Sequence, residues 1–453
     1  GYTHETSEED KKTIKLVREW FDRNKKHRST YDEHWLDYYK MFRGKQWKEQ
    51  RPSYRHSEVI NLVFQSIQSS VPILTDSRPR IEFLPKEPTD MELAKILNQV
   101  VESDWEQGNW TLNLVEMVYD AHFYGVGYAE MGFDSDLEDG EGQITFPRAD
   151  PFYCFPDCNA KGVNKQSDCF QYAEPIDVRL LKKRYPDKAK HIKPETVDLI
   201  HGDKTDLDQV RFKSPVDAKT IVEGTSAYEA SYRDRTILLT TYLKDDAYDE
   251  ERKDDKNPET GEVSTSFIQK AKYPNGRKIV TSGGVLLEDG PNPYDDGKFP
   301  YARLLNYVLP GEFYGVSEVE QLQSPQKIFN KLISFALDVL TLMGNPVWIV
   351  GTDSGVDTDN LFNRPGLIIE KEPGTEVTRQ EGVQLQPYVL QLIDRLAEWF
   401  DGISGTNDVT RGVRPEGITA ASAIGELQEA SKTRIRLKSR LLDAFLQDVG
   451  QMY

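Results

Sequence analysis

The sequence predicts an α+β fold, and three observations carry that prediction. Apolar residues recur at helical spacing towards both ends of the 453-residue chain. Between them lie short β-branched and aromatic runs, separated by Asn-Gly and Gly-Gly pairs that are typical of turns between antiparallel strands. The chain length suggests roughly three domains, and the hydrophobic content of 38% is enough to bury their cores. Wholesale disorder is therefore excluded.

Helices dominate the first part of the chain. Apolar periodicity and polar caps predict a helix over residues 7–26, and a separate aromatic helix follows through residues 35–42. The same periodicity predicts further helices over residues 59–74, 90–105 and 111–124. A short strand is predicted over residues 81–84, because the preceding Arg78-Pro79 pair favours extended backbone.

Antiparallel strands dominate the middle of the chain. A hairpin is predicted from residues 127–134 and 142–148, and a short helix over residues 177–185. Further strands are predicted over residues 236–244, 267–273, 278–281 and 284–287. The charged run 245–261 contains Pro258 and Gly261, and we interpret it as a solvated loop.

One long helix is the most informative element. Ser324-Pro325 favours a helix start and Gly344-Asn345-Pro346 favours an end, so the helix is predicted over residues 324–343. Most of its circumference is apolar. Its polar residues form one narrow stripe, and they are Lys327, Lys331, Ser334, Asp338 and Thr341, with Asn330 beside them. Two interpretations remain open: a central helix of a large domain with one solvent edge, or one of a ring of identical helices whose polar line faces an aqueous channel.

A small insertion and two more helices follow. Short β-like pieces are predicted at residues 347–350 and 367–370, and a helix then begins at Pro387 and ends at Gly402. Residues 404–421 are too rich in Gly, Pro and Arg for regular structure. A long charged helix is predicted from about Ala423. It carries what we take as the only dense basic cluster of the chain, residues 432–440, which we expect to pair with acidic neighbours.

The charge balance is strongly acidic. There are 57 Lys and Arg residues against 75 Asp and Glu residues, a formal net charge of −18. Such a balance disfavours a surface that wraps nucleic acid through its phosphates, but it allows a channel that repels the duplex. No uncharged apolar stretch reaches the length of a membrane span. The cysteines give no disulfide framework and fit buried structural positions in a reducing compartment: Cys154, Cys158 and Cys169.

Catalytic and metal signatures are weak. The acidic run from Asp134 resembles the start of a calcium loop, but it lacks the glycine and the final glutamate that such a loop requires. Gly125-Val-Gly127 follows a helix rather than a strand, and no phosphate-binding P-loop occurs. We therefore predict no catalytic residue, metal or cofactor. The alternative class is a cytoplasmic acidic enzyme or metal-binding protein that uses scattered carboxylates, since paired acids need no local signature.

Short motifs in a fixed order carry a resemblance to a known family. In the first half they are Tyr38 to Trp47, Asn61 with its helix, Thr75 to Pro85, Tyr124-Gly125-Val-Gly127-Tyr128, and Asp150-Pro151 with Asp157. In the second half they are Gly283-Gly284 to Tyr294, Phe299-Pro300-Tyr301, Pro310 to Gly315, Gln326, Arg411 to Gly417, and Gln428 to Arg434. Together they are similar to the portal proteins of tailed bacteriophages, most closely to those of the short-tailed phages, the podoviruses.

The resemblance implies a non-enzymatic ring, expected to be a dodecamer, at one capsid vertex. Double-stranded DNA would be packaged through it by a docked terminase large subunit and later ejected through head-to-tail adaptor proteins. Major capsid and scaffolding proteins would be further partners, and the protein would belong to the virion after assembly in the host cytoplasm. The implied parts are a wing (1–317), a stem helix (318–344), a small α/β clip (345–384), a second stem helix (385–403), a tunnel loop (404–421) and a long helix returning to the wing at the start of a crown (422–453).

Two sets of candidate site residues follow. Isolated cations can contact DNA phosphates without reading sequence, although a solvated helix face or salt bridges within the loop would explain them equally well. The residues expected to line the DNA channel are Lys327, Lys331, Asp338, Arg411 and Arg414. The clip residues expected to dock terminase and then the adaptors are Asp353, Asp357, Asp359, Arg364, Glu370 and Glu372.

Overall fold

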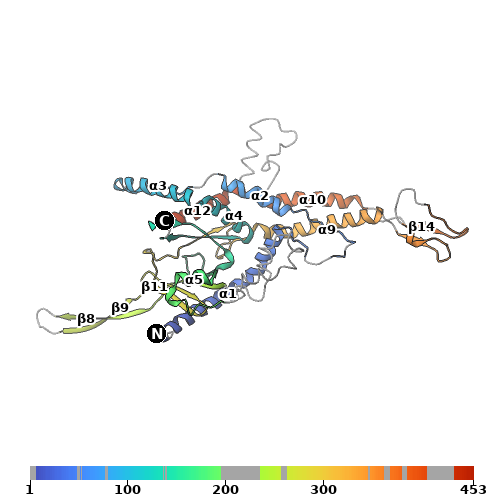
Figure 1. Cartoon of the computed structure of the whole chain (residues 1–453). Helices are drawn as coiled ribbons and strands as arrows, with labels where there is room; N and C mark the ends of the chain where they lie inside the picture. The colour runs from blue at the N-terminus through green and yellow to red at the C-terminus, as the bar shows by residue number, and fades with distance from the viewer. Residues whose placement is uncertain are drawn as a thin grey trace. The chain divides into compact units, whose positions relative to one another are not determined.

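The computed structural model describes residues 7–47, 51–52, 54–76, 80–135, 137, 140–194, 235–256, 263–344, 347–361, 368–379, 385–405 and 433–453. The chain divides into two compact units. Unit 1 comprises Gly1–Tyr39, Val71–Ser317 and Ile435–Tyr453, and unit 2 comprises Lys40–Ser70 and Glu318–Arg434. The helices and strands along the chain (Figure 1) confirm the predicted α+β class.

Helix α1 (Glu8–Phe42) is continuous over 35 residues, so the prediction of two separate helices is wrong. The polar residues at the predicted break include Arg28, which is only 1% exposed and donates to the backbone carbonyls of Pro151 and Cys154. Arg28 also pairs with Asp32 one turn later, at 3.0 Å. The apparent break is thus a polar stretch of helix with one buried arginine, and it contains no Gly or Pro that would end the helix.

Three further helices of the first part confirm their predictions, with small shifts at their ends: α2 (Leu62–Thr75), α3 (Met91–Gln107) and α4 (Trp110–Tyr124). The 3-10 helix η1 (Pro88–Asp90) leads into α3. The strand predicted over residues 81–84 is not formed. Phe83 instead donates its N–H to Asn98 Oδ1 at 2.8 Å and accepts from Asn98 Nδ2 at 3.1 Å. One side-chain amide on α3 therefore takes the place of a neighbouring strand.

An antiparallel five-stranded sheet lies in unit 1, in the order β11-β10-β7-β6-β5. Its strands are β5 (Cys154–Pro156), β6 (Cys169–Asp177), β7 (Arg235–Leu243), β10 (Arg277–Ser282) and β11 (Val285–Pro291). Helix α5 (Val178–Arg184) begins after Asp177, whose side chain accepts from Arg179 N. The predicted helix over residues 177–185 is thereby confirmed.

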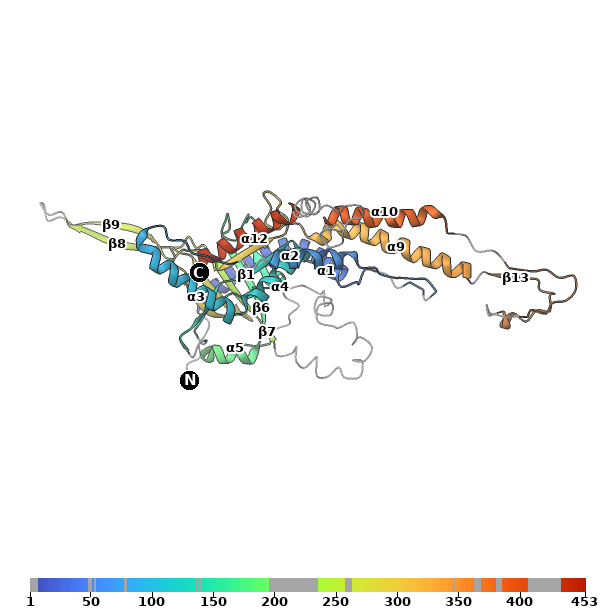
Figure 2. The same cartoon turned by 90° about the horizontal axis from the view of Figure 1, so that it is seen from above.

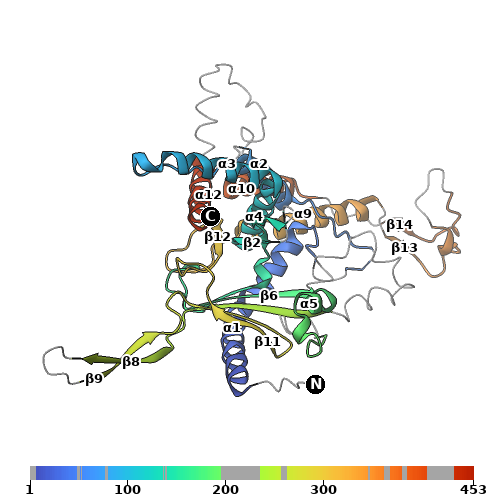
Figure 3. The same ribbon diagram turned by 60° about the vertical axis from the view of Figure 1, so that its left-hand side comes forward.

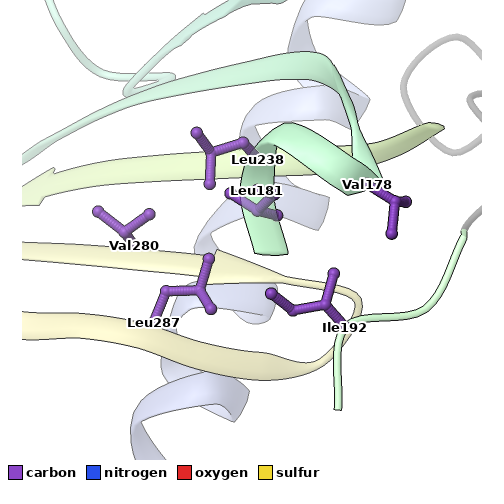
Figure 4. Close-up of a cluster of buried hydrophobic side chains, with 6 residues drawn as sticks. All are labelled: Val178, Leu181, Ile192, Leu238, Val280 and Leu287. Atoms are coloured by element: carbon purple, nitrogen blue, oxygen red, sulfur yellow. The ribbon is translucent and has the colours of Figure 1, made fainter. Parts of the chain in front are cut away.

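The sheet is covered on both faces. Figure 4 shows α5 contributing Val178 and Leu181 to a cluster with Leu238, Val280 and Leu287. The residues just before these three in the strands pack with α1 instead, because successive strand residues point to opposite faces. Ile237 packs with Phe21 of α1, and Ile279 and Leu286 pack with Val17 of the same helix. Figure 3 shows α5 and α1 beside this sheet.

A second, three-stranded sheet places β1 (Val126–Glu130) between β12 (Tyr301–Leu305) and β4 (Arg148–Ala149). The neighbouring pair β2 (Gly132–Asp134) and β3 (Gln143–Thr145) confirms the predicted hairpin. Gly125 and Gly315 touch through their backbones here: a Cβ on Gly125 would lie 2.2 Å from Gly315 O. Both positions therefore require glycine. Unit 1 also contains two short 3-10 helices, η3 (Pro151–Tyr153) and η4 (Pro186–Lys188).

The charged run 245–261 was predicted to be a solvated loop, and most of it is a strand. Strand β8 (Tyr248–Lys256) pairs with β9 (Val263–Ala271) over its whole length. The inter-strand N–H···O=C bonds of an antiparallel pair come from the backbone, so such a ribbon can form in a charged stretch of sequence.

Unit 2 contains the long helix α9 (Glu318–Gly344) and the helix α10 (Pro387–Ser404). Between them, β13 (Trp348–Val350) pairs with β14 (Val377–Arg379) and η6 (Thr358–Asn360) is a 3-10 helix. Strand β14 lies later in the chain than the second β-like piece predicted, residues 367–370, of which the described residues 368–370 form no strand. The predicted start of α9 at Ser324 is wrong, since Pro325 lies inside the helix and the fully buried Val319 and Leu322 belong to the turns before it. Helix α12 (Thr433–Met452) is the last element; residues 423–432 of the predicted long helix lie outside the described residues.

Candidate functional site

Helices α9 and α10 pack side by side in unit 2 (Figure 2). The buried apolar residues of α9 are Val319, Leu322, Phe329, Ala336 and Val339, and those of α10 are Val389, Leu396 and Phe400. In each helix these residues recur at three-, four- or seven-residue spacing, so they form one face. Gly405 ends α10 with a φ of 72°, a left-handed conformation that favours glycine.

A second apolar face of the two helices is left exposed. On α9 it includes Ile328 and Phe335, seven residues apart and 47% and 52% exposed. On α10 four exposed apolar residues follow one another at helical spacing: Tyr388, Leu392, Trp399 and Ile403. Large apolar side chains arranged in stripes on a solvent-exposed surface indicate a place where another protein surface packs.

The polar side of α9 is not simply a wet edge, because Gln326, next to the stripe, binds another segment of unit 2. Gln326 is fully buried and accepts hydrogen bonds from the N–H groups of Leu62 and Val63 at 2.9 and 3.2 Å. Its Nε2 donates to Ile60 O at 2.7 Å and to Asn330 Oδ1 at 3.0 Å. The Gln326 side chain therefore accepts hydrogen bonds from the first amides of α2, which have no acceptor within their own helix.

Two more amides complete this network, which we call the amide clamp: Gln46, Asn61, Gln326 and Asn330. Asn330 donates to Gln46 Oε1, and Gln46 Nε2 donates to Asn61 Oδ1 at 3.2 Å. Asn61 Oδ1 also accepts from Phe64 N at 3.0 Å at the start of α2, while its Nδ2 donates to Phe42 O at 2.7 Å at the end of α1. The clamp thus closes the loop between Gln46 and Asn61 and holds both of its ends on α9.

A further contact fixes the same loop nearer the end of α9. The N–H of His56 donates to Asp338 Oδ1 at 2.7 Å, and the His56 ring nitrogen Nε2 lies 2.9 Å from Thr341 Oγ1. Two residues of the stripe, Asp338 and Thr341, therefore contact His56, and Ser334 within the stripe is fully buried.

The structure places the predicted channel residues in different environments. Lys331 is exposed, whereas Lys327 is half-buried and its Nζ donates to Gln323 Oε1 at 3.2 Å. Asp338 is half-buried against His56. Arg411 and Arg414 lie outside the described residues. The role of this set in lining a channel stays a prediction.

The predicted docking residues that the structure describes are all exposed and acidic: Asp353, Asp357, Asp359, Glu370 and Glu372. Two features order this insertion. Glu372 N donates to Ser354 O at 2.9 Å, and the Asp357 side chain accepts from Asp359 N at 3.1 Å at the start of η6. Arg364 lies outside the described residues. Their role in docking also stays a prediction.

Three titratable groups of unit 1 are wholly or largely buried: Glu130, Cys154 and Cys169. Burial raises the pKa of Glu130 to about 7, although the Tyr301 hydroxyl that donates to it at 3.1 Å opposes the shift. Burial also raises the pKa of the Cys154 and Cys169 thiols, which disfavours the reactive thiolate. These two cysteines are fully buried as predicted, whereas Cys158 is half-buried.

Metal-binding groups and membrane-spanning helices are missing from the part of the chain that the structure describes. No three His, Cys, Asp or Glu side chains there are arranged to hold a metal ion, and none of the described helices is long and apolar enough to cross a membrane. A cleft of about 590 Å³ in unit 1 lies between the start of α4, α3 and the extended residues 80–82; Asn98, Glu102, Trp105 and Thr111 are among its lining.

Sequence reasoning found several of these residues without their connection. Gln46, Asn61 and Gln326 belong to separate motifs of the resemblance, and the structure joins them in one hydrogen-bond network. It missed Asn330 as the fourth member and His56 as a contact of α9. It also took residues 432–440 as the only dense basic cluster. Residues 43–56 contain as many lysines and arginines, and Lys438 of the predicted cluster is buried at 7% exposure.

A family comparison covers both units. The model of the phage P22-like portal protein family matches residues 18–453, a span that includes the amide clamp, α9 and α10. No curated protein matches the chain significantly. The match is to a family of portal proteins and not to an enzyme family. It confirms the resemblance to the portal proteins of tailed phages. The P22-like type is consistent with the predicted similarity to the short-tailed phages. The chain belongs to the phage P22-like portal protein family.

Proposed function

We propose that this portal protein assembles into a closed ring at one capsid vertex, through which double-stranded DNA is packaged and later ejected. The observation that carries the proposal is the exposed apolar face of α9 and α10, with Phe335 and Trp399 at 52% and 55% exposure. In a ring each copy presents two different surfaces to its two neighbours, so apolar area that one copy leaves open is covered by the next. Dodecameric symmetry is the expectation.

Under this proposal α9 and α10 are the stem helices and residues 345–384 are the clip. Residues 1–317 form the wing, residues 404–421 the tunnel loop, and the last helix returns to the wing at the start of a crown. DNA must slide through the channel without being held, which suits a chain with a net charge of −18. Exposed cations such as Lys331 would supply sparse phosphate contacts.

The clip is the proposed docking place for the terminase large subunit and then for the head-to-tail adaptor proteins. The exposed carboxylates Asp353, Asp359 and Glu370 give it an acidic surface, which favours basic patches on those partners. Major capsid and scaffolding proteins are the further partners, with assembly in the host cytoplasm and a final place in the virion.

Particle imaging and mass measurement of the purified protein test the ring. We expect closed rings with a central hole, whereas a stable monomer under all conditions would contradict the proposal. A second test concerns the tunnel loop, of which residues 406–421 lie outside the described residues. Deleting residues 409–417 should leave rings intact but impair packaging or retention of DNA, and loss of the ring itself would show that the loop is structural.

A further inference from the structure

The segment that covers one face of the five-stranded sheet is basic in an acidic protein. Residues 178–193, which include α5, contain seven lysines and arginines and a single aspartate, whereas the whole chain carries a net charge of −18. Four of these lysines are exposed and form what we call the lysine patch: Lys182, Lys183, Lys190 and Lys193. We propose that the lysine patch binds the phosphate backbone of double-stranded DNA, an inference that rests on the proposed function.

Buried apolar residues hold both ends of the segment on the same face of the sheet. Val178 and Leu181 of α5 belong to the same buried cluster as Ile192, which follows the helix in the chain (Figure 4). Ile192 is 2% exposed, whereas Lys193 beside it is exposed. The opposite face of the sheet is covered by α1. The lysine patch therefore lies on the water-facing side of a segment whose other side packs on the sheet.

Hydrogen bonds to strand β11 fix the part of the segment between α5 and Ile192. Lys188 Nζ donates to Leu286 O at 2.7 Å and to Leu287 O at 3.1 Å. The Tyr185 hydroxyl donates to the Glu288 carboxylate. The lysine patch is thus presented from a backbone that is already ordered, which lowers the entropy lost on binding.

Carboxylates of the protein already engage both arginines of the segment, but not the lysine patch. Arg179 pairs with Asp177 at 3.0 Å. Burial raises the pKa of Glu174, and the nearby Arg184 opposes that shift. Among the described residues, no carboxylate forms an ion pair with any lysine of the patch. The charge of these four lysines is therefore available to a ligand in solution.

The composition of this surface favours DNA phosphate over an acidic protein surface as the ligand. Protein interfaces are enriched in arginine, whose planar fork matches a carboxylate, and are depleted in lysine. The segment exposes one large apolar side chain, Leu180 at 61%, and so offers little apolar core to a protein partner. Lysine is a flexible point charge that contacts DNA phosphates without reading the sequence. Such binding weakens strongly with salt, as a protein that must let DNA move requires.

The test compares two variants of the assembled full-length protein. The patch variant carries Lys182→Gln, Lys183→Gln, Lys190→Gln and Lys193→Gln. The matched control removes four other exposed lysines of unit 1 that form no ion pair among the described residues, and it makes the same change in net charge: Lys12→Gln, Lys26→Gln, Lys86→Gln and Lys95→Gln. Binding of random-sequence duplex DNA is measured by fluorescence anisotropy over a series of NaCl concentrations, and ring mass is measured on every sample.

The patch variant should lower the magnitude of the slope of log binding constant against log salt by about 0.9 for each phosphate that the patch no longer binds, and so by up to about 3.6. The control should keep the slope of the unsubstituted protein. Replacing the four patch lysines with arginine keeps their charge and should also keep the slope. The single change Lys183→Gln, on the side of α5 away from the buried Leu181, should lower the slope by up to about 1 without affecting folding.

Rings with an unchanged slope in the patch variant would overturn this inference and leave the proposed function standing. Equal decreases in slope in the patch variant and the control would also overturn it, because the effect would be one of net charge. If the patch variant loses binding to poly-L-glutamate but keeps the DNA slope, the partner is an acidic protein surface and the inference is wrong. Absence of rings in the unsubstituted protein would instead count against the proposed function.

Discussion

The amide clamp allows a sharp test at Gln326. The Gln326→Leu substitution keeps a side chain of similar size and removes four hydrogen bonds, two from the α2 amides of Leu62 and Val63 and one each to Ile60 O and Asn330. Gln326 is fully buried, so water cannot readily replace these bonds. At ~1 kcal/mol for each bond, the segment should open more easily by ~4 kcal/mol.

Hydrogen exchange measures that opening directly and locally. A change of ~4 kcal/mol corresponds to roughly a 500- to 1,000-fold drop in protection of the Leu62 and Val63 amides. The control Gln323→Leu changes a half-buried glutamine of the same helix that bonds Lys327, and it should leave these amides unchanged. A drop below about tenfold in Gln326→Leu would refute the clamp as the anchor of this loop.

Three further substitutions test other parts of the structure. Glu130 stays protonated in the folded state up to pH about 7, so its contribution to the free energy of unfolding is complete below pH ~4.5 and is lost as the pH rises through 7. Glu130→Gln should therefore raise the free energy of unfolding by up to ~3 kcal/mol at pH 8 and by little at pH 4, as urea titrations at both pH values would show. Arg28→Met leaves buried carbonyls and Asp32 without their donor and should lower the free energy of unfolding, measured by urea titration, by ~3–5 kcal/mol. Arg18→Met, on the exposed side of α1, is the control and should lower it by under ~0.5 kcal/mol. Trp399→Ser removes ~100 Å² of exposed apolar surface and should weaken each subunit contact by ~2.5 kcal/mol. Native mass measurement would detect this loss as rings that break into smaller species, and Glu398→Gln is the control. Rings of unchanged stability in Trp399→Ser would place Trp399 outside the interface.

Elements with strong local signals could be predicted from the sequence. The alternation that puts Leu238 and Ile237 on opposite faces of the sheet is visible in the chain itself, and so is the Asp177 cap of α5. The apolar circumference of α9 indicated packing on several sides, and the exposed stripe at Ile328 and Phe335 shows that one of those sides is open in a single chain.

The errors arose where a distant residue supplies the hydrogen bonds. Arg28 looked like a break between helices because its carbonyl partners lie more than a hundred residues later. Phe83 looked like part of a strand, but its partner is the side chain of Asn98. The polar stripe of α9 was interpreted as facing water, since nothing in its own sequence reveals that residues 46–63 bind to it.

Imaging of the assembled protein by single-particle electron microscopy tests the central claim most directly. We expect a closed ring of identical copies around a hole wide enough for a DNA duplex, with the exposed faces of α9 and α10 that carry Phe335 and Trp399 buried between neighbours. A compact monomer, or a ring in which those side chains remain in contact with water, would contradict the claim.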